Sequence, residues 1–316
     1  MSAYVEFDLR KFEQNLKELT TKVPDIKFIF PVKCCNNEKI LELVSKYEYG
    51  FDISNMNEYN IIKKYLDGHF LSCSGPMSYE LESINYKNIK IVANNLSSYV
   101  KGKGLRINLN GNEKFDKSRF VEDYTLLSNF IKEELTYIHL HNSDHKDRKK
   151  CNDILDEIKI IISSFPNLRC IDIGGHLENL NFKIGIEYLK KMRSIIPIDI
   201  DILVEAGDFL FKNCGKLFCE VIDVIDNKIN QTVTLNFSKM ANQRWAYPIY
   251  YEEAKDELVD TIFYGCSCCE TDIYLETKAR RLKKGDKLIF QNISPYSYQW
   301  NTEFNGINKI RYDFKN

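Results

Sequence analysis

The sequence lacks an excess of charge of either sign. Its 44 Lys and Arg residues nearly balance its 45 Asp and Glu residues, which leaves a formal net charge of -1 at pH 7. Proteins that bind nucleic acid or anionic membrane surfaces usually carry a basic patch, and no basic stripe is found here. We therefore expect neither nucleic acid nor membrane as a partner, and a small molecule instead.

The sequence also lacks long hydrophobic runs. No stretch approaches the ~18 uncharged apolar residues that span a bilayer, and MSAYVEFDLRKFEQ at the N-terminus has no apolar segment behind a basic start. We therefore expect a cytoplasmic protein. In that compartment its ten cysteines would be reduced thiols, so no disulfide is expected.

Short apolar runs are abundant in the first two thirds of the chain. They are rich in β-branched and aromatic residues, and most are separated by stretches with helical spacing such as NEKILELVSKY. Eight such cycles predict an α/β fold, a (β/α)8 TIM barrel, over residues 8–212. The eight runs are 26–32, 49–53, 69–73, 89–93, 104–108, 137–141, 169–173 and 200–205.

The pattern changes after about residue 212. Alternating strands follow one another without intervening helices, as in KLFCEVIDVI, QTVTLNF, DTIFYGCS, DKLIFQNI and NGINKIRYDF. This texture predicts a separate β domain formed by residues 213–316 together with residues 1–7.

Lys33 follows the first apolar run, at a place where a barrel strand ends and faces the active site. It could be a lysine that extends its ammonium from a strand end into water. Alternatively, it could be a desolvated lysine with a lowered pKa, able to form a Schiff base with an aldehyde cofactor.

Two histidines, His139 and His141, lie two residues apart on the sixth run, so their side chains share one face. They could bind a metal ion, with His145, His176 or a cysteine completing the site. In a metal-dependent hydrolase, Asp172 would be the further ligand. One imidazole could instead stack on a planar ring, or be a satisfied barrel histidine. The spacing is not that of a zinc motif, and we expect no metal.

Glycines and an acid follow the last two runs. Gly174 and Gly175 come directly after the seventh run, where TIM barrels commonly bind phosphate through backbone N–H groups. Glu205 ends the eighth run and, if buried, needs a cationic or hydrogen-bonding partner. A protonated pyridine nitrogen or an arginine such as Arg106 would serve.

The segment GCSCCETD at 265–272 places three cysteines beside two acids. Its C-x-C-C spacing lacks the second cysteine pair of a zinc ribbon, which argues against a metal site. A thiol acting as an acid beside a carboxylate is the simpler interpretation.

Together these segments resemble the fold-type III, alanine-racemase-like pyridoxal-phosphate (PLP) decarboxylases, the group of ornithine, diaminopimelate and carboxynorspermidine decarboxylases. The resemblance runs in order from about residue 2 to residue 306. The segments that carry it are PVKCCNN, FDISNMNE with Asp52 and Glu58, GLRIN with Lys117-Ser118-Arg119, HLHN, IDIGGH, VEAGD, the Gly265, Cys268 and Asp272 pattern, and PYSYQWNTEFNG.

The resemblance implies a role for each matching residue. Lys33 would bind the PLP cofactor as a Schiff base, His139 would stack on its ring, and Glu205 would pair with the pyridine nitrogen. Gly174, Gly175 and Tyr296 would bind the phosphate. The remaining cofactor contacts would come from Asp52, Arg106, Asn142 and Gly207.

The β domain would complete the active site of a partner subunit in a head-to-tail homodimer. Cys268 would protonate the reacting carbon, and Asp272 would pair with the distal ammonium of a cationic amino acid. Glu270 and Tyr247 are further candidates for substrate contacts.

Some positions depart from the family pattern. His176 replaces a common third glycine, Ala206 replaces a proline, and the usual acidic dipeptide is missing from NQRWAYPIY, although the layout is most similar to carboxynorspermidine decarboxylase. The predicted reaction is decarboxylation of carboxynorspermidine, ornithine, lysine or diaminopimelate. An amino-acid racemase or epimerase on the same fold and a non-catalytic PLP-binding protein are the alternatives. The roles of Cys266 and Cys269 stay open.

Overall fold

The computed structural model describes residues 2–108, 122–140, 151–177, 180–245, 248–251 and 258–316. The chain forms two compact units, which we describe separately. The barrel unit is Asn15–Leu210, and the β unit is Met1–Gln14 with Phe211–Asn316. The first division falls inside helix α1 (Leu9–Lys22).

The barrel unit contains eight parallel strands in the order β5-β4-β3-β2-β10-β9-β8-β6, closed by pairing of β5 with β6. Each of the eight predicted runs forms one of these strands, so the TIM barrel is confirmed. A short strand, β7 (Glu122–Asp123), pairs with β6. The barrel strands are β2 (Lys27–Pro31), β3 (Gly50–Ile53), β4 (Leu71–Cys73), β5 (Ile89–Ala93), β6 (Gly104–Asn108), β8 (Tyr137–Leu140), β9 (Cys170–Asp172) and β10 (Asp201–Glu205).

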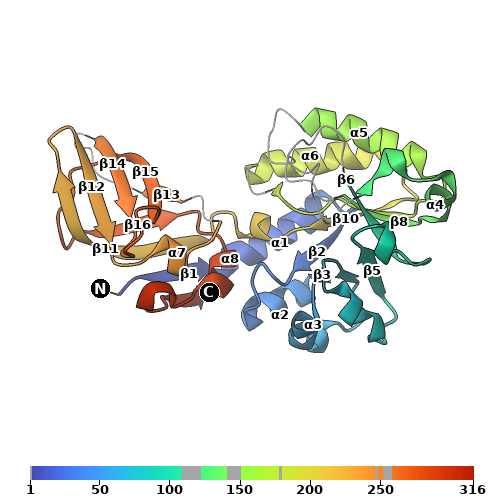
Figure 1. The fold of residues 1–316 in the computed structure, drawn as a ribbon, viewed down its shortest axis with the longest axis horizontal. Helices are drawn as coiled ribbons and strands as arrows, with labels where there is room; N and C mark the ends of the chain where they lie inside the picture. The colour runs from blue at the N-terminus through green and yellow to red at the C-terminus, as the bar shows by residue number, and fades with distance from the viewer. Residues whose placement is uncertain (1, 109–121, 141–150, 178–179, 246–247, 252–257) are drawn as a thin grey trace. The chain divides into compact units, whose positions relative to one another are not determined.

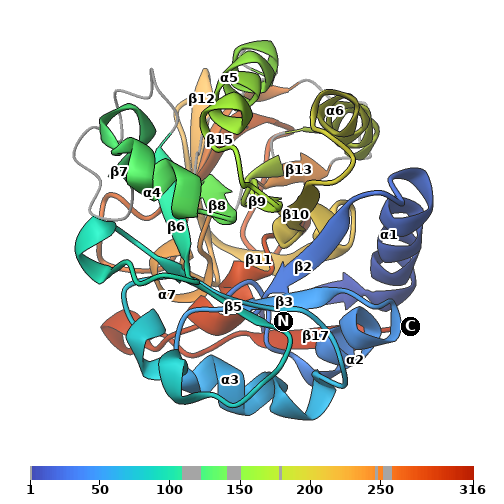
Figure 2. The same ribbon diagram turned by 90° about the vertical axis from the view of Figure 1, so that its right-hand side faces the viewer.

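Helices surround these strands (Figure 2). They are α2 (Glu38–Lys46), α3 (Met56–Ile62), α4 (Asn129–Glu134), α5 (Cys151–Ser164) and α6 (Phe182–Ile195). Asparagine residues cap the N-termini of three of these helices. The side chains of Asn37, Asn55 and Asn181 accept hydrogen bonds from the first turns of α2, α3 and α6. An N-cap side chain of this kind satisfies a backbone N–H that has no partner within the helix.

The regular strand–helix alternation fails after β4 and β5. The connections there carry only 3-10 turns, η2 (Ser78–Ser83) and η3 (Leu96–Ser98). Residues 94–103 between β5 and β6 are too few for a helix of ordinary length plus two loops. The predicted helices are therefore absent from these two described connections.

The inside of the barrel is packed with apolar side chains. Ile29, Val92, Tyr137 and Leu203 from four strands form one buried cluster. Because strands of a parallel barrel are covered on both faces, β3, β4 and β8 are buried along their whole length. A charged side chain at a strand end is therefore attached to backbone that is buried and well packed.

The β unit is a mostly antiparallel sheet with the path β13-β16-β11-β12-β14-β15, and β1 adds to it beside β11 and β17 (Figure 1). The predicted β domain is confirmed as a fold class, although β15 and β13 were not predicted. Its short helices are α7 (Lys239–Asn242) and α8 (Tyr296–Trp300). Its strands are β1 (Tyr4–Asp8), β11 (Gly215–Asp226), β12 (Asn230–Leu235), β13 (Ile249–Tyr251), β14 (Val259–Tyr264), β15 (Ile273–Ala279), β16 (Lys287–Gln291) and β17 (Arg311–Lys315).

Two further observations concern membrane-spanning helices and the state of the cysteines. Within the described residues, no helix combines the length and apolar character needed to cross a membrane. The nine cysteines whose side chains are described are all free thiols.

Candidate active site

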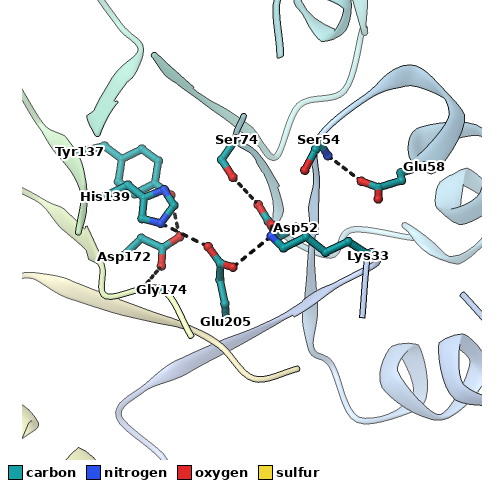
Figure 3. Close-up of polar contacts among 10 residues, drawn as sticks. All are labelled: Lys33, Asp52, Ser54, Glu58, Ser74, Tyr137, His139, Asp172, Gly174 and Glu205. Carbon is teal, nitrogen blue, oxygen red and sulfur yellow. Dashed lines mark hydrogen bonds and ion pairs between the residues drawn. The ribbon is translucent and has the colours of Figure 1, made fainter. Parts of the chain in front are cut away.

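Five polar residues meet at the carboxyl ends of the barrel strands (Figure 3). Asp52, His139, Asp172 and Glu205 lie on β3, β8, β9 and β10, and Lys33 follows β2 by two residues. The strands are in register, with His139 opposite Asp172. Parallel strands end at the same rim of a barrel, so residues far apart in sequence are brought together.

Lys33 contacts two carboxylates. Its Nζ donates to Asp52 Oδ2 at 3.0 Å and to Glu205 Oε2 at 3.4 Å. Its side chain is 42% exposed, so of the two interpretations given for Lys33 this exposure favours an ammonium that reaches water from the strand end. The chain turns just after β2, where Cys34 N donates to Pro31 O, and this turn directs Lys33 toward the barrel mouth.

Asp52 is buried and has two partners. Its Oδ1 accepts a hydrogen bond from Ser74 Oγ at 3.2 Å, while Oδ2 contacts Lys33. Burial raises the pKa of Asp52 to about 7, and the nearby Lys33 charge opposes this rise. Glu58 accepts from Ser54 N at 2.7 Å, and burial raises its pKa also.

His139 and Glu205 form a second contact in the same site. His139 Nε2 lies 3.2 Å from Glu205 Oε1, and the histidine is fully buried. Burial lowers the pKa of His139, and Glu205 opposes this shift. Burial also lowers the pKa of Arg106, which is 7% exposed. A buried imidazole with a lowered pKa is neutral near pH 7, so it can present a flat, uncharged ring.

Asp172 organises the glycine loop that follows β9. Its Oδ1 accepts from Gly174 N at 2.8 Å, and its Oδ2 accepts from Tyr137 Oη at 3.2 Å. Burial, followed by the charge of Glu205, raises the pKa of Asp172 well above its ordinary value. Tyr137 and Ser74 were not predicted as site residues. The signal in the sequence for Asp172 was its position at the end of an apolar run, two residues before Gly174.

The glycine loop passes very close to other backbone atoms. Gly174 has φ +67°, and a Cβ at Gly175 would lie 2.9 Å from Glu205 O. His176, which stands where many family members have glycine, also adopts a positive φ of 66°. A left-handed backbone here turns the loop sharply, and side chains at the two glycines would not fit.

Gly207 makes a similar close approach on the loop after β10. A Cβ at this position would lie 2.9 Å from Pro31 Cγ and 3.3 Å from Cys34 Sγ. The loop after Glu205 therefore packs directly against the turn that carries Lys33.

The remaining predicted residues lie in the β unit. Cys268 and Glu270 are exposed, and Cys268 N donates to Asn305 Oδ1 at 3.1 Å. Asp272 is 0% exposed, and its two oxygens accept from Met240 N and Ser267 N. These hydrogen bonds support a structural role for Asp272, and its predicted contact with substrate stays a prediction.

Tyr296 begins α8, and its ring makes an edge contact with Trp245 at 5.0 Å. Several predicted positions lie outside the described residues. They are Lys117, Ser118, Arg119, His141, Asn142, His145 and Tyr247.

One cluster in the barrel could also hold a metal ion. Ligand atoms of His139, Asp172 and Glu205 all lie within 4.8 Å of one another. Each oxygen of Asp172 also accepts one hydrogen bond, as the carboxylates of metal sites commonly do.

The donor set of the barrel fits PLP. Asp52, Asp172 and Glu205 place three buried carboxylates near Lys33 and Arg106. A protonated ring nitrogen would supply the further positive charge that such a crowded set of acids favours. Lys33 offers an amine at the mouth of the barrel, and the glycine loop offers backbone N–H groups.

Comparisons with known proteins support this assignment of the cofactor. Residues 9–67 match the family model for the pyridoxal binding domain of pyridoxal-dependent decarboxylases, a segment that includes Lys33, Asp52 and Glu58. No curated protein matches the chain.

Solved structures of several decarboxylases are similar to the whole chain. Lysine/ornithine decarboxylase of Vibrio vulnificus, complexed with cadaverine, has a TM-score of 0.79 at 15% identity, covering 100% of this chain and 95% of that one. The arginine decarboxylase of Paramecium bursaria Chlorella virus has a TM-score of 0.76 at 16% identity, covering 100% and 97%.

Carboxynorspermidine decarboxylase of Campylobacter jejuni, complexed with norspermidine, has a TM-score of 0.75 at 18% identity, covering 99% of this chain and 94% of that one. The resemblance predicted from the sequence is confirmed at the level of the fold. The chain has the two-unit fold of the pyridoxal-dependent decarboxylases, and its residues 9–67 match their pyridoxal binding domain.

Proposed function

We propose that the protein is a PLP-dependent decarboxylase of an amino acid with a cationic side chain. The observation that carries this proposal is the position of Lys33 Nζ, 3.0 and 3.4 Å from the carboxylates of Asp52 and Glu205. Structures with the same fold are named as complexes with cadaverine and norspermidine, which supports a diamino acid or a carboxy-polyamine as substrate.

Bound PLP supplies an aldehyde that reacts with amines and a ring that takes up the electron pair left when carbon dioxide departs. The chain's own groups hold the cofactor. Glu205 would keep a proton on the pyridine nitrogen, and His139 would stack on the ring. The glycine loop would bind the phosphate through the N–H of Gly175, because the N–H of Gly174 already donates to Asp172. Tyr296 of the β unit stays a predicted phosphate contact. Asp52 and Arg106 would balance the remaining charge.

Lys33 must lose a proton before it can act as a nucleophile. Asp52 Oδ2 lies 3.0 Å away, within reach for proton transfer. Its pKa of about 7 makes it a far better proton acceptor than an ordinary aspartate. Asp52 would therefore receive the ammonium proton and return it later.

The β unit would contribute the acid that protonates the reacting carbon. Cys268 is exposed, as a group that works in a partner's site must be. Its backbone N–H is bound by Asn305, which fixes the segment that carries the thiol. We propose a homodimer with shared sites in the cytoplasm, in which each Cys268 serves the partner's barrel and Glu270 or Tyr247 contacts the substrate.

Borohydride reduction tests the cofactor assignment without any substrate. In the purified protein supplied with PLP, reduction should attach the cofactor irreversibly to the peptide that contains Lys33, as read by mass spectrometry. Lys33→Ala should lose the label and essentially all turnover, while Lys39→Ala on the exposed start of α2 should keep both. Absence of label in the unaltered protein would reject PLP as the cofactor.

Product analysis separates decarboxylation from the alternatives. Release of carbon dioxide from ornithine, lysine, diaminopimelate or carboxynorspermidine would support the proposal. Inversion of configuration without carbon dioxide would indicate a racemase. Labelling of Lys33 without turnover of any amino acid would favour a non-catalytic PLP-binding protein.

A metal-dependent hydrolase is the second candidate, favoured by the close ligand atoms of His139, Asp172 and Glu205. Elemental analysis of the purified protein tests it. A stoichiometric metal that is lost in His139→Ala, together with no labelling of Lys33, would support this candidate over the decarboxylase.

A further inference from the structure

Both tryptophans of the chain, Trp245 and Trp300, contact the same arginine in the β unit. The guanidinium carbon of Arg244 lies 5.1 Å from the ring centre of Trp245 and 4.5 Å from that of Trp300. Trp300 Nε1 donates to Met240 O at 3.3 Å, which anchors its indole ring. The arginine is therefore held in a defined place although it lies at the surface.

These residues line a hollow of about 430 Å³, which we call the Arg244 hollow. Small-molecule sites commonly have volumes of about 300–1,000 Å³. The described residues that line it include two cations and no carboxylate. They are Lys239, Met240, Gln243, Arg244, Trp245, Thr271 and Trp300.

Other charges near the hollow are already engaged. Lys239 Nζ donates to Ile273 O at 3.0 Å. The buried carboxylate of Asp272, behind Met240, accepts from Met240 N and Ser267 N. Arg244, by contrast, is exposed.

Arg244 differs from the arginines that follow it in the same unit. Arg280, Arg281 and Arg311 each form an ion pair with an aspartate. Within the part of the chain that the structure describes, Arg244 has no ion pair. Arg311 also lies over an aromatic ring, that of Tyr4, so an aromatic contact alone does not explain the difference.

The backbone beside Arg244 is strained. Trp245 has φ 48°, a left-handed conformation that a bulky side chain rarely adopts. Strained backbone of this kind is concentrated at ligand sites and active sites. Here it places an exposed indole ring beside a cation.

The planar, paired N–H donors of a guanidinium favour a particular class of ligand. Both indole rings lie near the guanidinium carbon, at 5.1 and 4.5 Å, and rings at such distances attract a cation without using its N–H donors. A planar carboxylate accepts two such donors side by side. We infer that the Arg244 hollow binds the carboxylate of a small organic acid. This inference does not depend on PLP.

Intrinsic fluorescence reports on this site alone, because both tryptophans of the chain are part of it. We would titrate the purified full-length protein with glutarate. The matched ligands are glutaramide, which has the same carbon skeleton without charge, and inorganic phosphate. A saturable change with glutarate, and a much weaker one with both matched ligands, is the expected result.

Three variants test the role of the guanidinium. Arg244→Gln should weaken glutarate binding by at least about tenfold, and Arg244→Lys should bind with intermediate strength because it keeps the charge but loses the paired donors. Arg311→Gln is the control, since Arg311 stacks on Tyr4 outside the hollow, and it should bind as the unaltered protein does.

Several outcomes would overturn the inference. They are no saturable change with glutarate, equal binding of glutaramide or phosphate, and unchanged binding in Arg244→Gln. Thermal unfolding of each variant shows whether it folds. If Arg244→Gln does not fold, weaker binding in Arg244→Lys still tests the inference. Borohydride labelling of Lys33 in the same samples reports separately on the proposed decarboxylase.

Discussion

The barrel unit and the β unit hold their candidate catalytic groups in opposite ways. In the barrel, Asp52, Asp172 and Glu205 are buried carboxyl groups that the strands bring together. In the β unit, one short motif is divided between an exposed thiol at Cys268 and a buried carboxylate at Asp272. The barrel therefore brings several candidate groups together within one unit, whereas the exposed thiol of the β unit would act, under the proposed function, only at another surface.

The largest expected effect tests the barrel half of this comparison. Glu205→Gln keeps the size of the side chain but removes the charge that faces Lys33 and His139. We expect decarboxylation to fall by about 10²–10³-fold, because a positioned charge in a buried site contributes about that much. The measurement is the initial rate of carbon dioxide release at saturating PLP.

Glu187→Gln on the exposed face of α6 is the matched control, and it should leave the rate unchanged. Equal rates in all three proteins would mean that Glu205 has no part in the reaction.

A smaller effect tests whether Cys268 and Asp272 have different roles in the cysteine motif. Asp272→Asn should lower the free energy of unfolding by about 1–3 kcal/mol, because the new amide group meets backbone N–H donors in a buried place. Denaturant unfolding followed by circular dichroism measures this loss.

Cys268→Ala, four residues earlier, is the comparison variant. Its side chain is exposed, so we expect unchanged stability but slowed or misdirected protonation of the product. If Asp272→Asn instead raises KM without loss of stability, the carboxylate contacts substrate and the structural role is wrong.

The smallest effect is a dependence of stability on pH. The folded protein raises the pKa of Asp52 to about 7, above about 3.9 for an unfolded chain. The folded state therefore binds this proton more tightly. The contribution of Asp52 is complete below about pH 4 and is lost as the pH rises through about 7.

Urea unfolding of the PLP-free protein at about pH 5 and about pH 8 would measure this loss. Asp52→Asn should reduce the difference between the two pH values. Asp67→Asn, an exposed aspartate, should not. An unchanged pH dependence in Asp52→Asn would show that another group causes it.

The sequence predicted the barrel strands well because each is a short apolar run, and three of them, β3, β4 and β8, are buried along their whole length. β15 was missed because exposed or half-buried polar residues, such as Glu276 and Lys278, interrupt its apolar pattern. The short connections after β4 and β5 were also misjudged, since periodicity does not report how much room a helix needs.

The site residues divide in the same way. Lys33, His139 and Glu205 follow apolar runs and could be predicted from position. The contacts of Ser74 with Asp52 and of Tyr137 with Asp172 join residues 22 and 35 positions apart, and nothing in the local sequence marks them. The burial of Asp272 depends on Met240 and Ser267, so the motif alone suggested a ligand contact.

The closure of the barrel gives it one weak seam. β5 and β6 are joined in register only at Val92 with Gly104 and Ala93 with Leu105, whereas β2, β3 and β4 pair over three positions at each junction. The connections on both sides of β5 are 3-10 turns. Local opening begins where backbone pairing is shortest, so amide hydrogens along this seam should exchange with solvent before those at the Lys33 side of the cylinder. The barrel would thus open locally on the side away from Lys33.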